Sequence, residues 1–183
     1  MMSCHGRTNG AQGHRSAFEV GLAGNPNTGK SSILNALTGS RHHVGNWPGK
    51  TVARLEGTFS ASGIDVLVVD LPGIYSFAAS SPEQVIARDY LSAGGRDAVI
   101  TVVDAANLER NLYMAVQILE MDVPAVVALN MVDVAQRRGL SVNATRLSAR
   151  LGVPVVPTVA RTGRGIDTLR TALVDLARCD CAA

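Results

Sequence analysis

The chain has 183 residues, of which 46% are apolar and 17% are charged, and its formal net charge is only +2. This balance fits one ordinary domain with a full core, and it disfavours a nucleic-acid-binding module, which usually carries a dense basic face. No apolar run approaches the ~20 residues that a membrane span needs, and the first residues lack the apolar core of a signal peptide.

Residues 1–16 show no periodicity and are expected to be a disordered tail. From Phe18 onward, apolar runs typical of buried parallel strands alternate with segments of helical spacing. In chain order the expected strands are 18–23, 54–60 at a sheet edge, 64–70, 98–104, 125–130 and 153–156. The expected helices are 29–37, 82–92, 107–121, 141–151 and 165–178. The alternation predicts one α/β domain over 17–178 with a mostly parallel, doubly wound, six-stranded sheet, followed by a short tail over 179–183.

The first chemical motif is "GNPNTGKS", which matches G-x-x-x-x-G-K-[ST] between an expected strand and an expected helix. Its glycines let backbone N–H groups surround phosphate oxygens, and the helix amino terminus adds its dipole. Lys30 is expected to reach the terminal phosphates and Ser31 to bind Mg²⁺. The expected nucleotide-binding residues of this loop are Gly24, Asn25, Pro26, Asn27, Thr28, Gly29, Lys30, Ser31 and Ser32.

The second motif is "DLPG", which comes at the end of the apolar run 64–70. A carboxylate that ends a neighbouring strand can hold Mg²⁺, often through water, and this assigns Asp70 to the metal. The turn of Leu71, Pro72 and Gly73 would follow, with the Gly73 N–H at a terminal phosphate. The next residue is Ile74, whose side chain cannot orient a water molecule, so intrinsic turnover is expected to be slow.

The third motif is "NMVD", directly after the expected strand 125–130. Asp133 can accept hydrogen bonds from the ring N–H and the amino group of guanine, whereas adenine would leave the carboxylate unpaired. Asn130 is expected to tie this loop to the phosphate loop, and Met131 to pack on the base. Thr158, Val159 and Ala160 lie at the next strand end, where backbone N–H groups can bind the guanine carbonyl.

Residues 42–54, "HHVGNWPGKTVAR", are expected to form a long loop without secondary structure, which is more often functional or mobile than not. Thr51 is its best candidate ligand, because its hydroxyl can close over Mg²⁺ when a γ-phosphate is present. Gly49 and Lys50 would lie beside the nucleotide with it. For Trp47 the alternative is a hydrophobic plug that pins the loop.

These motifs, with "GNPNTGKSSILNALTG", "VGNWPGKTV", "DLPGIYS", "DAANLERNLY" and "ALNMVD", resemble the amino-terminal G domain of the FeoB family of prokaryotic ferrous iron transport proteins. The similarity runs from Phe18 to Leu176. It implies a Ras-like P-loop GTPase fold with Mg²⁺ at Ser31, Thr51 and Asp70. It also implies a GTP-hydrolysing domain on the cytosolic face of an inner-membrane Fe²⁺ transporter, with a helical domain and a membrane region as its partners.

The resemblance also implies stimulation by K⁺. In K⁺-activated GTPases that this chain resembles, the position of Asn27 offers a side-chain oxygen to potassium, and the carbonyls of Gly45 and Trp47 would complete the site. Catalysis is then assigned to Lys30, Thr51, Gly73 and Asn27, and the alternative for Asn27 is a brace of the phosphate loop. The chain departs from the family pattern at Lys50, where an apolar residue is common, and at Val159, where Ser often stands.

Two other functions stay open at this stage. One is a K⁺-dependent GTPase of ribosome assembly or tRNA modification, which would need a basic face or an added RNA-binding domain. The other is a switch that binds GTP and a partner without useful turnover, which Ile74 favours.

The terminal residues Cys4, His5, His14, Cys179 and Cys181 invite an iron site, since soft and borderline metals prefer such ligands. Their spacing matches no compact metal site, so disordered ends are the preferred interpretation. Cysteines confined to the chain ends also indicate a reducing compartment without structural disulfides.

Overall fold

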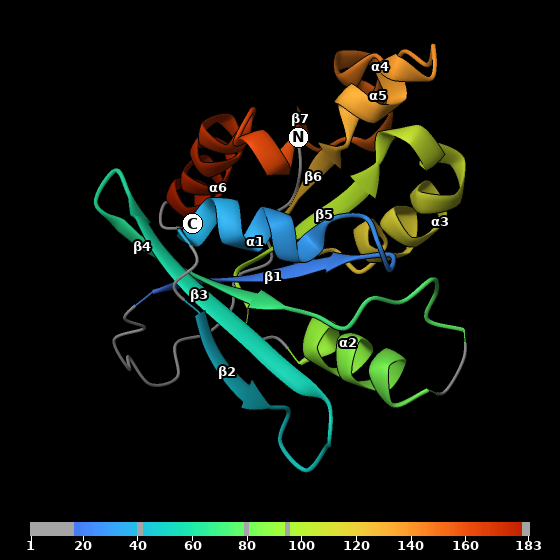
Figure 1. The fold of residues 1–183 in the computed structure, drawn as a ribbon. Coiled ribbons are helices and arrows are strands. Elements are labelled where there is room, and N and C mark those ends of the chain that lie inside the picture. Colours follow the sequence, from blue (N-terminus) through green and yellow to red (C-terminus); the bar gives the residue numbers. More distant parts are fainter. Residues whose placement is uncertain (1–16, 40–41, 79–80, 94–95, 181–183) are drawn as a thin grey trace, which may run out of the picture.

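The computed structural model describes residues 17–39, 42–78, 81–93 and 96–180, and it forms one α/β domain around a single sheet (Figure 1). The sheet has the strand order β2-β3-β4-β1-β5-β6-β7. Its strands are β1 (Phe18–Gly24), β2 (His42–Asn46), β3 (Ala53–Ala61), β4 (Ile64–Asp70), β5 (Ala98–Asp104), β6 (Ala125–Asn130) and β7 (Val155–Pro157). The helices are α1 (Lys30–Thr38), α2 (Pro82–Ser92), α3 (Leu108–Leu119), α4 (Val132–Arg137), α5 (Ala144–Leu151) and α6 (Ile166–Asp180), with short 3₁₀ turns η1 (Ala105–Asn107) and η2 (Ala160–Thr162).

The parallel part of the sheet agrees with the apolar runs in the sequence. β1 pairs in parallel with both β4 and β5, and β6 lies between β5 and β7. β5 and β6 are buried along their whole length, because helices cover both faces of the sheet. The carboxyl ends of β1, β4, β6 and β7 therefore meet at one edge. The three motifs follow β1, β4 and β6 there, and residues 158–160 follow β7.

The antiparallel edge of the sheet differs from the prediction. Residues 42–54 were expected to lack secondary structure, but His42–Asn46 form β2, which pairs with β3 from His42↔Gly57 to Asn46↔Ala53. β3 is therefore an inner strand and the sheet has seven strands rather than six. The run His-His-Val-Gly-Asn has no apolar alternation, and its strand conformation comes from pairing with a distant segment, which local pattern does not report. The short helix α4 was also not predicted.

Two helical layers enclose the sheet (Figure 1). On one face, α1 and α6 bury Ile33, Leu34 and Leu173 against strand residues such as Leu22 and Ile100. On the other face, α2 and α3 pack against the sheet in a cluster that contains Leu91, Met114, Ile118, Val69 and Val99.

A third apolar cluster lies under α4 and α5 and contains Val103, Val127 and Leu129. No helix in the described part of the chain combines the length and apolar character that a membrane crossing requires. The expected tail over 1–16 and the residues Cys4, His5, His14 and Cys181 lie outside the described residues, whereas Cys179 is exposed on α6.

Candidate nucleotide-binding site

The phosphate loop joins β1 to α1 and is shaped by backbone conformations that most residues avoid. Asn27 has φ 64° and Gly29 has φ 88°, and α1 begins at Lys30 without a side-chain cap. A Cβ at Gly29 would collide with the amide nitrogen of Asn130, so only glycine fits there. The first N–H groups of a helix have no acceptor inside the helix. Those of Lys30, Ser31 and Ser32 therefore form the kind of cradle that binds phosphate oxygens.

Lys30 and Asp70 form the charged centre of this edge. The Lys30 ammonium lies beside the backbone of Gly73, because a Cβ there would be 2.9 Å from Lys30 Nζ. Burial raises the pKa of the Asp70 carboxyl to about 6, and the neighbouring Lys30 charge opposes part of that rise. Burial also lowers the pKa of Lys30, again opposed by Asp70.

The donor set at Asp70 suits a hard cation. Asp70 Oδ1 is buried and accepts no hydrogen bond from any described residue. Ser31 is exposed in the first turn of α1 at the same sheet edge, and its hydroxyl is available. A carboxylate and a hydroxyl oxygen are ligands that Mg²⁺ prefers, so these two residues fit the metal.

Asn130 links the three loops of the site. Its side-chain nitrogen donates to the Thr28 carbonyl at 2.9 Å, across 102 residues of sequence. Its Oδ1 accepts from the Ala160 N–H at 3.1 Å and from the Thr158 hydroxyl at 3.3 Å. The predicted tie between this loop and the phosphate loop is confirmed, and it extends to the loop after β7. All three contacts are buried, which strengthens the cross-link.

A cavity of about 320 Å³ opens between these loops and is large enough for a purine. Asp133 lies in its wall, with one carboxylate oxygen accepting from Arg137 at 3.1 Å. Met131 caps the start of α4 with φ 60° and lines the same space. The lining residues are Gly29, Ser32, Asn130, Met131, Asp133, Val134, Arg137, Val159, Ala160 and Arg161.

The loop after β7 contributes to this cavity differently from the prediction. The N–H groups of Thr158, Val159 and Ala160 already donate to Leu129 O, Arg164 O and Asn130 Oδ1. They are therefore not free for a guanine carbonyl. Arg161, which lines the cavity and follows directly, was missed because an arginine in a loop carries no signal of its own.

The predicted residues of the 42–54 segment line neither the cavity beside Asp133 nor the polar space beside Asn25. Trp47, Pro48, Gly49 and Lys50 form a tight turn in which the Lys50 N–H donates to the Trp47 carbonyl at 2.9 Å. Proline followed by glycine at φ 67° is the pattern of a type II turn. The strand register places this turn at the carboxyl edge of the sheet, because Leu55 at the start of β3 pairs with Asp70 at the end of β4. In Figure 1 it lies at the tip of the β2–β3 hairpin. Thr51 and Lys50 are exposed in this turn, and Gly45 lies in β2.

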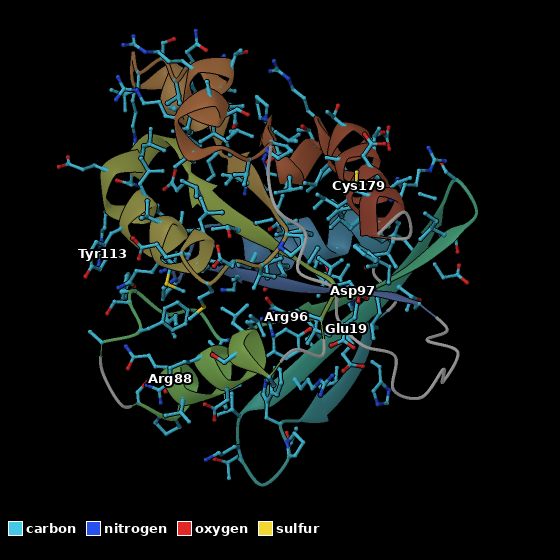
Figure 2. The ribbon with its side chains drawn as sticks, turned by 180° about the vertical axis from the view of Figure 1, so that it is seen from behind. Glu19, Arg88, Arg96, Asp97, Tyr113 and Cys179 are labelled. Carbon is cyan, nitrogen blue, oxygen red and sulfur yellow. The ribbon has the colours of Figure 1, made fainter. Side chains whose placement is uncertain are left out.

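Trp47 holds the turn in that position. Its side chain is 7% exposed, and its ring meets the Tyr90 ring edge-on with 5.6 Å between centroids. The Arg54 guanidinium lies 4.8 Å from the centre of the Trp47 ring. Tyr90 in turn donates to Glu19 at 2.8 Å, near the amino end of β1, where Figure 2 also places Arg96 and Asp97. The interpretation of Trp47 as a hydrophobic plug agrees with this packing.

A second polar space of about 190 Å³ adjoins the phosphate loop on the α3 side. The side-chain amide of Asn25 and the Oδ1 of Asn111 are buried there without partners among the described residues. Arg110 covers the ring of Tyr75 at 4.4 Å beside them. Asn111 and Arg110 were missed because one asparagine or arginine in a helix has many ordinary explanations.

This fold and site define a P-loop domain of the Ras-like GTPase class. The sequence model of the family described as ferrous iron transport protein B matches residues 18–173. The chain is 50% identical over 158 residues to the Fe(2+) transporter FeoB of Escherichia coli (strain K12), which covers 84% of this chain and 20% of that protein. It is 49% identical over the same length to the Fe(2+) transporter FeoB of Salmonella typhimurium, again with 84% and 20% covered.

Solved structures give the same result. The G domain of the T. maritima FeoB iron transporter superimposes with a TM-score of 0.83 at 43% identity, covering 88% of this chain and 99% of that one. An S. thermophilus NFeoB N11A mutant bound to mGDP gives a TM-score of 0.82 at 46% identity, covering 86% and 60%. The chain belongs to the ferrous iron transport protein B (FeoB) family. It spans one fifth of the length of the curated relatives described above.

Proposed function

We propose that this chain is the GTP-binding and GTP-hydrolysing domain of a ferrous iron transporter, in which the nucleotide state regulates or gates iron uptake. The observation that carries the proposal is the Asn130 cross-link, which sets the phosphate loop and Asp133 around one purine-sized cavity. The FeoB relatives are named Fe(2+) transporters, and a solved one is bound to GDP. Because the chain spans a fifth of those transporters, the helical and membrane partners and the position at the cytosolic face of the bacterial inner membrane are part of the proposal.

Base selection follows from the chemistry of the cavity wall. The Asp133 carboxylate is an acceptor, and guanine presents two N–H donors along one edge that match it. Adenine presents neither in that geometry and would leave the carboxylate desolvated without a partner. Arg137, which already donates to Asp133, would hold the carboxylate in place. The backbone N–H groups of residues 158–160 already donate hydrogen bonds within the protein. The next one along the chain, the N–H of Arg161, is therefore the candidate donor to the guanine carbonyl.

The phosphates would lie over the amino end of α1. Lys30 would neutralise the terminal phosphates while the Gly73 N–H contacts the last of them, consistent with the short approach between these residues. Ser31 and Asp70 would hold Mg²⁺, which supplies positive charge to the phosphate oxygens during transfer. Thr51, which is exposed in the β2–β3 turn at the same edge of the sheet, is the third proposed ligand.

GTP hydrolysis in the absence of a stimulating cation is expected to be slow. Ile74 is 4% exposed and packs in the α2–α3 cluster, so it neither orients water nor donates to a phosphate. Asn27 is exposed at the phosphate loop and offers an amide oxygen suited to K⁺. The other two proposed K⁺ ligands are the backbone carbonyls of Gly45 in β2 and of Trp47, which accepts from the Lys50 N–H in the turn.

The decisive experiment compares GTP hydrolysis in KCl and NaCl at equal ionic strength, for the wild type and for Asn27→Ala. The expected result is faster hydrolysis in KCl that the substitution removes, with ATP hydrolysed in neither salt. Equal rates of hydrolysis in both salts would refute stimulation by K⁺. GTP binding with no turnover in either salt would instead establish a switch that binds GTP without hydrolysing it. The ribosome or tRNA-modification alternative is not favoured, because the family is that of iron transporters.

A further inference from the structure

The positive charge of this chain is concentrated in one segment. Residues 134–166 contain six arginines and no acidic residue, so the segment carries +6. The rest of the chain contains the remaining 11 basic residues and all 15 acidic residues, so its formal net charge is −4. The small net charge therefore conceals an uneven distribution of charge along the chain.

The structure displays all six arginines on its surface. Each is exposed, and they come from the end of α4, from α5, and from η2 with the turn after it. Figures 1 and 2 show α4 and α5 side by side at one end of the molecule, where nitrogen-tipped side chains project outward. We call this surface the arginine face; it consists of Arg137, Arg138, Arg146, Arg150, Arg161, Arg164 and the exposed Leu140.

Neighbouring protein groups do not account for these charges. Among the described residues, only Arg137 has a carboxylate partner, Asp133. Arg146 and Arg150 are four residues apart on α5, so they share one side of a helix and repel each other. Uncompensated like charges disfavour the folded state, and an external anion removes that cost.

We propose that the arginine face binds the phosphates of an anionic lipid bilayer. Guanidinium groups bind phosphate oxygens through paired N–H donors, and an array of them suits a surface of headgroups. Leu140 is 46% exposed in the α4–α5 connection, amid the arginines, and an apolar side chain there suits the boundary between headgroups and acyl chains.

A phosphate array can also be a nucleic acid, and the composition of the face disfavours that source. Residues 134–166 contain no Phe, Tyr or Trp, whereas surfaces for single-stranded nucleic acid usually interleave aromatic residues on which bases stack. The relatives are named transporters, and some are solved as cytosolic domains. If the proposed function holds, this domain therefore lies close to a lipid bilayer. Vesicle binding needs no GTP hydrolysis, so the two proposals fail separately.

The test is co-sedimentation of the chain with large vesicles of phosphatidylcholine, with or without 30 mol% phosphatidylglycerol. We expect binding to the anionic vesicles only, and a steep fall in binding as NaCl is raised. The double variant Arg146→Glu/Arg150→Glu should reduce the partition coefficient at least about tenfold, since each basic residue near the surface contributes substantially. Neither residue lines the base cavity, so guanine nucleotide binding should be unchanged and reports that the variant is folded.

The matched control is Arg88→Glu/Arg178→Glu, which changes the net charge equally on exposed residues of α2 and α6. It should retain most of the vesicle binding, and Leu140→Ala should weaken binding while preserving its salt dependence. Equal binding to both vesicle types, or equal losses in the two double variants, would overturn the proposal. So would an RNA oligonucleotide that binds through Arg146 and Arg150 while anionic vesicles do not bind.

Discussion

The two sides of the nucleotide site are built in opposite ways. On the base side, Asn130 joins the phosphate loop, α4 and the loop after β7 through buried hydrogen bonds, so the cavity already exists. On the side of the β2–β3 turn, Trp47 is buried against Tyr90, whereas the proposed ligand Thr51 is exposed and lines neither cavity of the site. The difference is one between a wall that buried hydrogen bonds cross-link and an exposed turn that one aromatic side chain anchors, so we expect the turn to be the part that responds to the nucleotide.

The largest expected effect is on base choice. Asp133→Asn exchanges an acceptor for a donor at the cavity wall, so the preference for GTP over xanthosine triphosphate should fall by about 10³-fold or more. Competition between the two nucleotides for a fluorescent analogue measures this directly. Unchanged affinity for both would show that Asp133 does not read the base.

Substitution of Asn130, which cross-links the loops of the site, should have nearly as large an effect on nucleotide binding. Asn130→Ala leaves the buried Thr28 carbonyl and Ala160 N–H without partners, at a cost of about 2–4 kcal/mol in unfolding free energy. Nucleotide affinity should fall roughly 100-fold, because both walls of the cavity lose their tie.

The control for this substitution is Asn143→Ala, which removes the cap of α5, where Asn143 accepts from the Arg146 N–H at 2.8 Å. It should cost about 1 kcal/mol in denaturant titrations and leave nucleotide affinity intact. If both substitutions weakened nucleotide binding equally, the special role of Asn130 would be refuted.

The Asp70 carboxyl should make the nucleotide-free protein sensitive to pH. Its pKa, about 6 in the folded state, lies above the ordinary 3.8, so the folded state binds the proton more tightly than the unfolded chain. The free energy of unfolding should therefore fall as pH rises from 4 to 6, by up to about 3 kcal/mol. Mg²⁺ needs the ionised carboxylate, so Mg²⁺-dependent nucleotide binding should weaken below pH 6.

The matched variant is Asp70→Asn, which keeps the shape of the side chain and removes its titration. Its unfolding free energy should lose this pH slope, and its nucleotide affinity should lose the response to Mg²⁺. A slope that persists in the variant would assign the effect to another group.

The smallest expected effect concerns the turn itself. Trp47 fluorescence should differ between the GDP state and a non-hydrolysable GTP state, because triphosphate should draw Thr51 toward Mg²⁺. Tyr90→Ala should shift Trp47 emission to longer wavelength in the nucleotide-free protein, while Tyr113→Ala, an exposed tyrosine on α3, should not. Identical spectra in both nucleotide states would contradict movement at this turn.

The sequence predicted the parts of the site that depend on local chemistry. The phosphate loop, Asp70 and Asp133 follow apolar strands, and parallel strands deliver their carboxyl ends to one edge, so placing these residues together needed no coordinates. The link through Asn130 was also predictable, because a buried amide between two loops must find partners. Segments 42–46 and 132–137 were not recognised as regular structure, since their conformations come from contacts rather than from their own residue pattern.

The sequence by itself therefore determined the class of fold, the family, the phosphate loop and the carboxylate proposed to face the base, because each rests on residue types at fixed spacing beside apolar runs. Only the tertiary structure decided where the β2–β3 turn lies, which backbone donors near 158–160 are already engaged, and that six arginines share one surface. Those features depend on distances between segments far apart in the chain, such as Trp47 and Tyr90 or Arg137 and Arg161. Side-chain packing and strand pairing set such distances, and neither leaves a periodic trace in the residues concerned.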